Sequence, residues 1–257
     1  MDLAETQNIE LSGVTGRKAP ARRFEHQRGY VLHSYPYSET SLIIETYTRE
    51  HGRVPLVAKG AKRPRSTLRG VLMQFQPLGL TWSGKGDLRS LIDAEWLGGL
   101  PALSGNRLFC GFYLNELLLK LLARDDAHER LFDCYERALR ELAGGAGEAG
   151  VLRAFERELL REIGYALNLT HEADDGPALD PEGRYTYHPE RGPRRLQGSE
   201  HADVEFSGRT LLELDSGNYS SPQTAMQAKL LMRYLLNHHL NGKVLATRLI
   251  FTQLQQL

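Results

Sequence analysis

The chain has 257 residues, of which 41% are hydrophobic and 25% are charged, and its 32 basic residues balance its 32 acidic residues. This length accommodates one large domain or two of ordinary size, each with its own core. No apolar run approaches the roughly 18 residues that a membrane span requires, and the N-terminus lacks the apolar centre of a signal peptide. We therefore expect a cytoplasmic protein with no membrane partner.

The first segment, residues 1–27, is polar and shows neither helical nor strand periodicity. We expect a disordered extension, because the segment offers little apolar surface to bury. Its basic residues, Arg17, Lys18, Arg22 and Arg23, would add weak electrostatic attraction for a polyanion.

Residues 28–100 show the pattern of short β-strands, rich in aromatic and β-branched residues and separated by turn residues. The expected strands cover residues 30–35, 41–48, 54–58, 77–83 and 88–96. A short helix is expected within residues 67–75. Five short strands in so short a segment favour a small barrel, for which the OB-fold is the natural candidate.

The period becomes helical beyond Pro101. Helices are expected over residues 105–122, 131–142, 152–163, 206–214, 222–241 and 245–250, with an irregular or hairpin insert at 168–203. The first of these helices is apolar on nearly all sides, so it should lie at the centre of its domain. The sequence thus predicts an α+β protein, with a five-stranded OB-fold barrel followed by a mainly α-helical domain at 101–257.

Motifs for catalysis or metal binding are not supported. Gly79–Gly86 nearly matches a P-loop, but Gly86 stands where Ser or Thr would hold magnesium, and a strand is expected next instead of a helix. The adjacent His238 and His239 cannot share a helix face as metal ligands do. Cys110 and Cys134 lie far apart in helical patterns, which favours buried thiols. We find no catalytic constellation, and a nuclease or ATPase is disfavoured.

The charge is unevenly distributed, because no Asp or Glu occurs from His51 to Gly86. The candidate phosphate-binding residues in this window are Arg53, Lys59, Lys62, Arg63, Arg65 and Arg69. Such a run alone is more often a solvated face. Its place after a barrel strand favours a polyanion, because barrels of this class bind oligonucleotides with a strand face and its flanking loops. Aromatic residues offer stacking faces for unpaired bases, and some of them must be core; they are Tyr30, Tyr35, Tyr37, Tyr47 and Trp82.

Several of these segments resemble the RecO family of bacterial DNA repair proteins. The resemblance lies in residues 31–42 (VLHSYPYSETSL), in Gly52-Arg53-Val54 with residues 57–61 (VAKGA), and in residues 103–105, 113–118 and 155–160 with 164–165. It runs from about residue 29 to about residue 243 and is weakest in the 172–205 insert.

The resemblance implies a non-enzymatic protein with an OB-fold and a helical domain. Members of the family bind single- and double-stranded DNA, anneal complementary strands, associate with RecR and help load RecA onto DNA coated by single-stranded DNA-binding protein. Many members carry a four-cysteine zinc module after the segment that matches residues 165–169. Here residues 168–173 read NLTHEA, without cysteine, so we expect no zinc site and no other cofactor.

The resemblance also implies a pocket for the acidic, phenylalanine-ended tail of single-stranded DNA-binding protein. Such a tail requires apolar surface and a cation for its carboxylate. Arg153, beside Phe155 on the helix expected at 152–163, is the candidate, although an ordinary surface arginine explains it equally well. The rival interpretation of the whole chain is a protein–protein adaptor in which DNA binding is minor.

Overall fold

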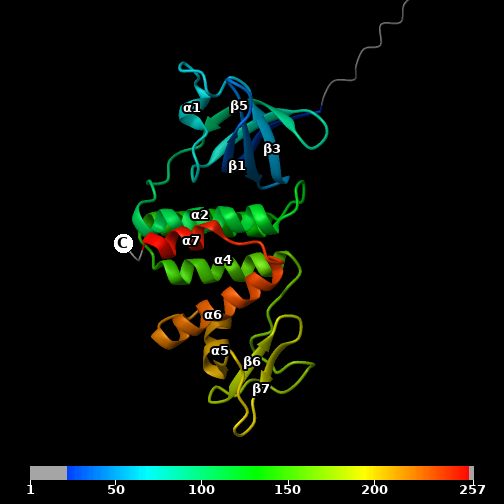
Figure 1. Ribbon diagram of the computed structural model, residues 1–257. Helices are drawn as coiled ribbons and strands as arrows, with labels where there is room; N and C mark the ends of the chain where they lie inside the picture. The colour runs from blue at the N-terminus through cyan, green and yellow to red at the C-terminus, as the bar shows by residue number, and fades with distance from the viewer. Residues whose placement is uncertain (1–21, 255–257) are drawn as a thin grey trace, which may run out of the picture.

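The N-terminal part of the chain is a closed five-stranded barrel in the computed structural model, which describes residues 22–254 (Figure 1). Its strands are β1 (Arg23–Pro36), β2 (Leu42–Thr48), β3 (Gly52–Ala58), β4 (Leu78–Ser83) and β5 (Arg89–Trp96), in the order β1-β2-β3-β5-β4. β3 and β5 pair in parallel, and the other neighbours are antiparallel. The long β1 pairs with β4 through its first half and with β2 through its second, which closes the barrel. The predicted OB-fold is confirmed.

Alternation along the strands fills the barrel. On β3, Val54, Leu56 and Ala58 enter the barrel core, where they meet Trp82 and Leu80 of β4. The residues between them face outward, because successive side chains of a strand point to opposite faces. The near-P-loop segment consists of most of β4 and the start of the hairpin turn to β5, and the predicted hairpin is confirmed.

The boundary predicted at residue 28 is corrected by the structure. β1 begins at Arg23, and Phe24 stacks on Trp82 with ring centroids 5.2 Å apart. Residues 23–27 therefore belong to the barrel, because Arg23, Phe24 and Gln27 pair with β4 on either side of a register irregularity. The expectation of a disordered tail otherwise falls on residues 1–21, which lie outside the described residues.

The second half of the chain is mainly helical, as predicted. Its helices are α2 (Gly105–Leu121), α3 (Glu129–Gly144), α4 (Glu148–Glu162), α5 (Gly208–Ser216), α6 (Pro222–His239) and α7 (Ala246–Leu254), while the short α1 (Leu68–Val71) belongs to the barrel half. α2 lies between the barrel and the α4 and α7 helices (Figure 1). This position explains why the sequence of α2 is apolar on nearly all sides.

The predicted insert contains a small sheet. Strands β6 (Arg184–His188), β7 (Gly192–Arg195) and β8 (Phe206–Ser207) pair in the order β7-β6-β8. Tyr185 and Phe206 are buried beneath it and join the main helical core. Of the two forms expected for this insert, irregular or hairpin, the structure shows a hairpin of β6 and β7.

The barrel and the helices share one core. The side chains of Tyr30 and Tyr47 project from the outer face of the barrel and pack against Phe132 and Tyr135 of α3. The Tyr30 hydroxyl donates a hydrogen bond to Glu136 at 2.8 Å. The two halves are thus fixed to each other by buried aromatic and polar contacts. Within residues 22–254, the helices are too short or too polar to cross a lipid bilayer.

Candidate nucleic-acid interface

The segment between β3 and α1 is a series of tight turns. The backbone N–H of Arg63 donates to Gly60 O at 3.0 Å, and that of Ser66 donates to Arg63 O at 3.0 Å. The N–H of Lys62 donates to Thr40 O at 2.9 Å, which ties the segment to the β1–β2 turn. The segment leads into α1 at the end of the barrel remote from the helical half (Figure 1). Its backbone is therefore ordered while its side chains face solvent.

Five of the six predicted cations are exposed on this segment. Together Lys59, Lys62, Arg63, Arg65 and Arg69 form what we call the basic loop. Within residues 22–254, no carboxylate lies within ion-pair distance of any of the five. The Lys62 ammonium donates to Ser38 O at 3.3 Å, which leaves its charge uncompensated. The basic loop therefore presents net positive charge to solvent.

Several other arginines of the chain are neutralised by carboxylates. Arg49 pairs with Glu129 and Asp133, and Arg209 pairs with Glu182. Paired charges attract phosphate weakly, because the phosphate must compete with an oxygen already in place. The basic loop thus differs from these paired arginines, because none of its five cations has a carboxylate partner within residues 22–254.

Exposed aromatic rings lie next to the basic loop. Tyr35 and Tyr37, at the end of β1 and in the turn after it, are 45% and 47% exposed, and the ring of His33 lies 4.4 Å from that of Tyr35. The same turn carries the exposed Glu39, an acid. Unstacked bases could pack on these rings while the basic loop contacts phosphates. The other three aromatic candidates are core residues, because Tyr30, Tyr47 and Trp82 are fully buried.

Arg53, the sixth predicted DNA contact, has a structural role instead. Its side chain is 10% exposed, and its Nη1 donates to the backbone carbonyls of Leu119 and Leu122, each at 2.7 Å. Its Nη2 donates to Glu45 at 3.2 Å. Arg53 faces outward from the barrel, but the helical half covers that face. It cannot reach phosphate, and the prediction is corrected.

A second site lies between α2, α4, α6 and α7, where a pocket of about 270 Å³ opens. Apolar groups of Phe109 and Leu152 line it, together with the cations Lys229, Arg233 and Arg248. Its depth holds Arg153 and Glu156, which pair through two bonds of 2.6 Å. An apolar pocket with an excess of cations fits an acidic peptide that ends in an apolar residue. The structure therefore supplies a site of the predicted chemistry.

The two residues predicted for this site differ in their outcome. Arg153 lines the pocket, but Glu156 already occupies the Nε/Nη2 edge of its guanidinium. Phe155 is fully buried in the helical core and cannot contact a partner. The sequence analysis missed Lys229 and Arg233. Their spacing of four residues on one helix was the available signal, because such residues share a helix face.

The Cys110 thiol also lines this pocket. Burial raises its pKa to about 11, so the thiol stays protonated at neutral pH and is a weak nucleophile. The prediction of two buried thiols is confirmed for Cys134, whereas Cys110 is only partly buried.

Comparison with known proteins assigns the chain to a family. The family model described as "Recombination protein O N terminal" matches residues 23–100, and the one described as "Recombination protein O C terminal" matches residues 102–247. The chain belongs to the RecO family. The first match begins where β1 begins, which supports the corrected start of the barrel.

Curated RecO proteins are similar over nearly their whole length. The DNA repair protein RecO of Ralstonia nicotianae is 52% identical over 253 residues, covering 96% of this chain and 93% of that protein. The DNA repair protein RecO of Nitrosospira multiformis is 52% identical over 237 residues, covering 92% of this chain and 98% of its own. Membership places the chain among the proteins of DNA repair and recombination.

The zinc module of many RecO proteins does not fit the residues found here. Cys110 and Cys134 lie on α2 and α3, away from the insert. The Nδ1 of His171 lies 2.9 Å from the hydroxyl of Thr170. Within the described part of the chain, no three His, Cys, Asp or Glu residues are grouped so as to hold a metal ion. The donor set for a structural zinc, which requires four such ligands, is therefore missing from the insert.

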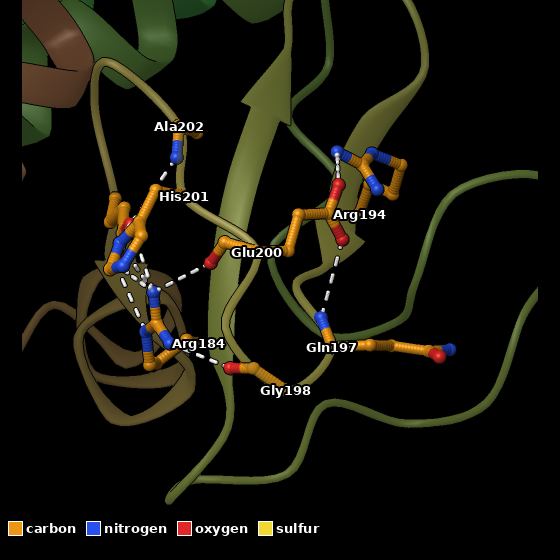
Figure 2. A network of polar contacts seen from close by, with 8 residues as sticks. Arg184, Arg194, Gln197, Gly198, Glu200, His201 and Ala202 are labelled. Carbon is orange, nitrogen blue, oxygen red and sulfur yellow. Dashed lines mark hydrogen bonds and ion pairs between the residues drawn. The ribbon is translucent and has the colours of Figure 1, made fainter.

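Ion pairs and hydrogen bonds fasten the insert instead (Figure 2). Arg184 donates from Nε and Nη2 to Glu205, at 3.0 and 2.9 Å, and from Nη2 to Glu200 O at 2.9 Å. The Glu200 carboxylate accepts from Arg194 at 2.7 Å and from the N–H of Gln197 at 3.3 Å. These contacts join β6 and β7 to the segment that leads into β8. They are exposed, so each contributes little by itself.

Proposed function

We propose that the chain is a recombination mediator that binds single- and double-stranded DNA without reading sequence and anneals complementary strands. It would act in the cytoplasm, at the nucleoid, and with RecR help load RecA onto DNA coated by single-stranded DNA-binding protein. The observation that carries the DNA-binding proposal is the basic loop, whose exposed cations lack carboxylate partners among residues 22–254. No catalytic step is required.

The chemistry of annealing supports this assignment. Two strands repel each other through their phosphates, and a cationic surface lowers that repulsion by neutralising phosphates and releasing counterions. Phosphate contacts position a strand and carry no sequence information. Stacking on Tyr35 or Tyr37 would hold bases apart from their neighbours, with their pairing edges available.

Reversal of charge in the basic loop tests the proposal. In the triple variant Lys62→Glu, Arg63→Glu, Arg65→Glu, we expect DNA affinity to fall by about tenfold or more. The log–log slope of affinity against salt should become shallower by about two, because each lost phosphate contact removes roughly 0.7–0.9. Fluorescence anisotropy of a labelled oligonucleotide across a salt series measures both quantities, and strand annealing should slow in parallel.

A matched control separates local charge from net charge. Arg130→Glu, Arg137→Glu and Arg209→Glu change the net charge equally at exposed positions on α3 and α5. This control should keep the wild-type salt slope. An equal loss of slope in both triple variants, or in neither, would refute the basic loop as the DNA contact.

We further propose that the pocket between α2, α4, α6 and α7 binds the tail of single-stranded DNA-binding protein. The apolar walls would receive the terminal phenylalanine. Lys229 and Arg233 would pair with the acidic residues and the terminal carboxylate, because both are exposed at the pocket. Arg153 would act from beneath by fixing Glu156.

The double variant Lys229→Glu, Arg233→Glu should lower affinity for a synthetic tail peptide by at least about tenfold, since two attractive charges become repulsive. Isothermal titration calorimetry with the peptide measures this. The triple variant of the basic loop is the control and should bind the peptide normally. Normal peptide binding by the double variant would reject this pocket.

The rival function, a protein adaptor with minor DNA binding, draws on the same pocket. The two variants discriminate between these functions. If the chain is an adaptor, the pocket variant should abolish RecA loading while the basic-loop variant has no effect. If it is a mediator that holds DNA directly, each variant should impair loading on its own.

We also propose that the chain folds and acts without zinc. A chelator should leave its melting temperature unchanged, and metal analysis of the purified chain should find far less than one zinc per molecule. Raised salt should instead loosen the insert, because exposed ion pairs are screened. Hydrogen exchange of β6 and β7 measures that effect, and a chelator-induced increase in their exchange would contradict the proposal.

A further inference from the structure

A second cationic pocket lies at the C-terminal end of α6. It has a volume of about 360 Å³ and is lined by the end of α2, the segment after α4 and the connection from α6 to α7. The chemically distinctive lining residues are Lys120, Tyr165, His238, His239 and Lys243. We call it the histidine pocket. The function proposed above does not use it.

The charge of the histidine pocket is one-sided, because its lining contains no carboxylate. The Lys120 ammonium is held by Val244 O at 2.9 Å and by Glu116 at 3.4 Å, at the edge of the pocket. Lys243 is exposed, and within residues 22–254 its ammonium has no hydrogen-bond or ion-pair partner. Two lysines thus flank a space that no acidic side chain occupies.

The helix end alone does not account for these cations. Basic residues are favoured at helix C-termini, where backbone carbonyls lack partners. Here the N–H groups of Leu240, Asn241 and Lys243 already donate to Leu236, His238 and Leu240, at 2.9, 3.3 and 2.9 Å. Lys120 and Tyr165 moreover come from other segments of the fold. The pocket gathers these groups from three places in the chain.

An aromatic platform lies beside the cations. Tyr165 is 43% exposed, and its ring lies 3.7 Å from that of His239, centroid to centroid, at an interplanar angle of 34°. Burial, and then the charge of neighbouring His238, lower the pKa of His239. The His239 ring is therefore neutral at pH 7 and can support the tyrosine ring by stacking. A flat, partly exposed ring next to cations is the arrangement that binds an unstacked base together with its phosphate.

We propose that the histidine pocket binds one nucleotide unit, with the phosphate between His238 and Lys243 and the base on Tyr165. The inference rests on the proposed function, which it deepens by adding a second nucleic-acid contact. The basic loop lies at the far end of the barrel, and α2 separates the barrel from the layer that contains α4 and α6 (Figure 1). One molecule would then hold two strands, or two stretches of one strand, at separate places.

The experiment compares full-length variants that change one group each. Tyr165→Leu removes the stacking face, and affinity for a labelled oligothymidylate should fall at least about fivefold with an unchanged salt slope. Lys243→Gln should flatten the slope by about 0.7, the value of one single-strand phosphate contact. Arg130→Gln, at an exposed position on α3, is the matched control and should change neither quantity. Thermal melting should show that all three variants fold normally.

Two further experiments distinguish a nucleotide within a DNA strand from a free nucleotide. An oligonucleotide that contains bromodeoxyuridine should photocrosslink to the peptide that carries Tyr165, which assigns the pocket to a strand. Free thymidine monophosphate is the second probe. If it binds the wild type but not the Tyr165→Leu variant, and both proteins have the same affinity for the oligonucleotide, the pocket binds free nucleotides instead of a strand.

Three results would overturn the inference. One is unchanged affinity and slope in both pocket variants while the basic-loop triple variant loses binding, which would leave the proposed function intact. Another is unchanged binding in all of these variants, which would remove the proposed function as well. The third is loss of tail-peptide affinity in Tyr165→Leu with normal DNA binding, which would make the pocket a peptide site.

Discussion

Arg53→Met is expected to destabilise the whole chain by about 3–5 kcal/mol, the range for breaking a buried ion pair from one side. The Arg53 guanidinium bonds the carbonyls of Leu119 and Leu122 at the end of α2, as well as the Glu45 carboxylate. Methionine fills much of the same space but donates no hydrogen bond. Two carbonyls would lose their donor. Glu45, whose side chain is 5% exposed, would keep only Arg124 as an ion-pair partner among the residues that the structure describes.

Thermal melting measures the loss, which corresponds to a fall of roughly 10 °C for a chain of this size. Below the melting transition, the folded molecules should keep wild-type DNA affinity and salt slope, because Arg53 cannot reach phosphate. Lys62→Met is the matched control and should show the reverse, with normal melting and a shallower slope. A changed salt slope in folded Arg53→Met would return this residue to the DNA contact.

Arg53 also shows why the sequence could not separate structural from functional cations. The alternation of β3 correctly places its side chain on the outside of the barrel. Outside usually means solvent, and only the docked helical half turns this position into a buried one. Tyr30 and Tyr47 likewise point outward from the barrel but are buried by the helices, so they cannot stack on bases. Local periodicity predicts which way a side chain points, and the packing of a second domain decides what it meets.

The basic loop was predictable because its signal is local. A window free of acids ensures that no nearby carboxylate in the sequence can pair with Lys59 or Arg65, and turn residues such as Gly60 and Pro64 predict exposure. The pocket at α6 and α7 was not predictable in the same way. Its cations come from α4, α6 and α7, and its apolar wall from α2 and α4. No single segment of the sequence indicates that these residues come together in the fold. The sequence therefore pointed to Phe155, which is next to Arg153 on one helix, instead of Lys229.

The second large expected loss of stability comes from a substitution at Gly52, where the turn between β2 and β3 meets the start of β3. Gly52 has φ +62°, and a Cβ atom there would lie 1.9 Å from the Asp126 backbone oxygen and 2.5 Å from its carbonyl carbon. Asp126 lies in the connection between α2 and α3. Two hydrogen bonds hold this connection to the barrel: the N–H of Asp125 donates to Arg53 O at 3.0 Å, and the Tyr47 hydroxyl donates to His128 O at 3.2 Å. The backbone at Asp126 therefore cannot move away from an added Cβ at Gly52 without breaking those hydrogen bonds.

Gly52→Ala should therefore destabilise the chain by about 3 kcal/mol or more, the sum of a left-handed backbone strain and lost contacts between the two halves. Gly86→Ala is the matched control, because Gly86 has φ +90° with no atom within 4 Å of its Cβ position. It should show only the strain, about 1–3 kcal/mol. Denaturant unfolding of both variants measures the difference. Equal losses would mean that the close approach to Asp126 contributes nothing, whereas a larger loss in Gly52→Ala shows that the barrel and the helices are stabilised by their contact at this turn.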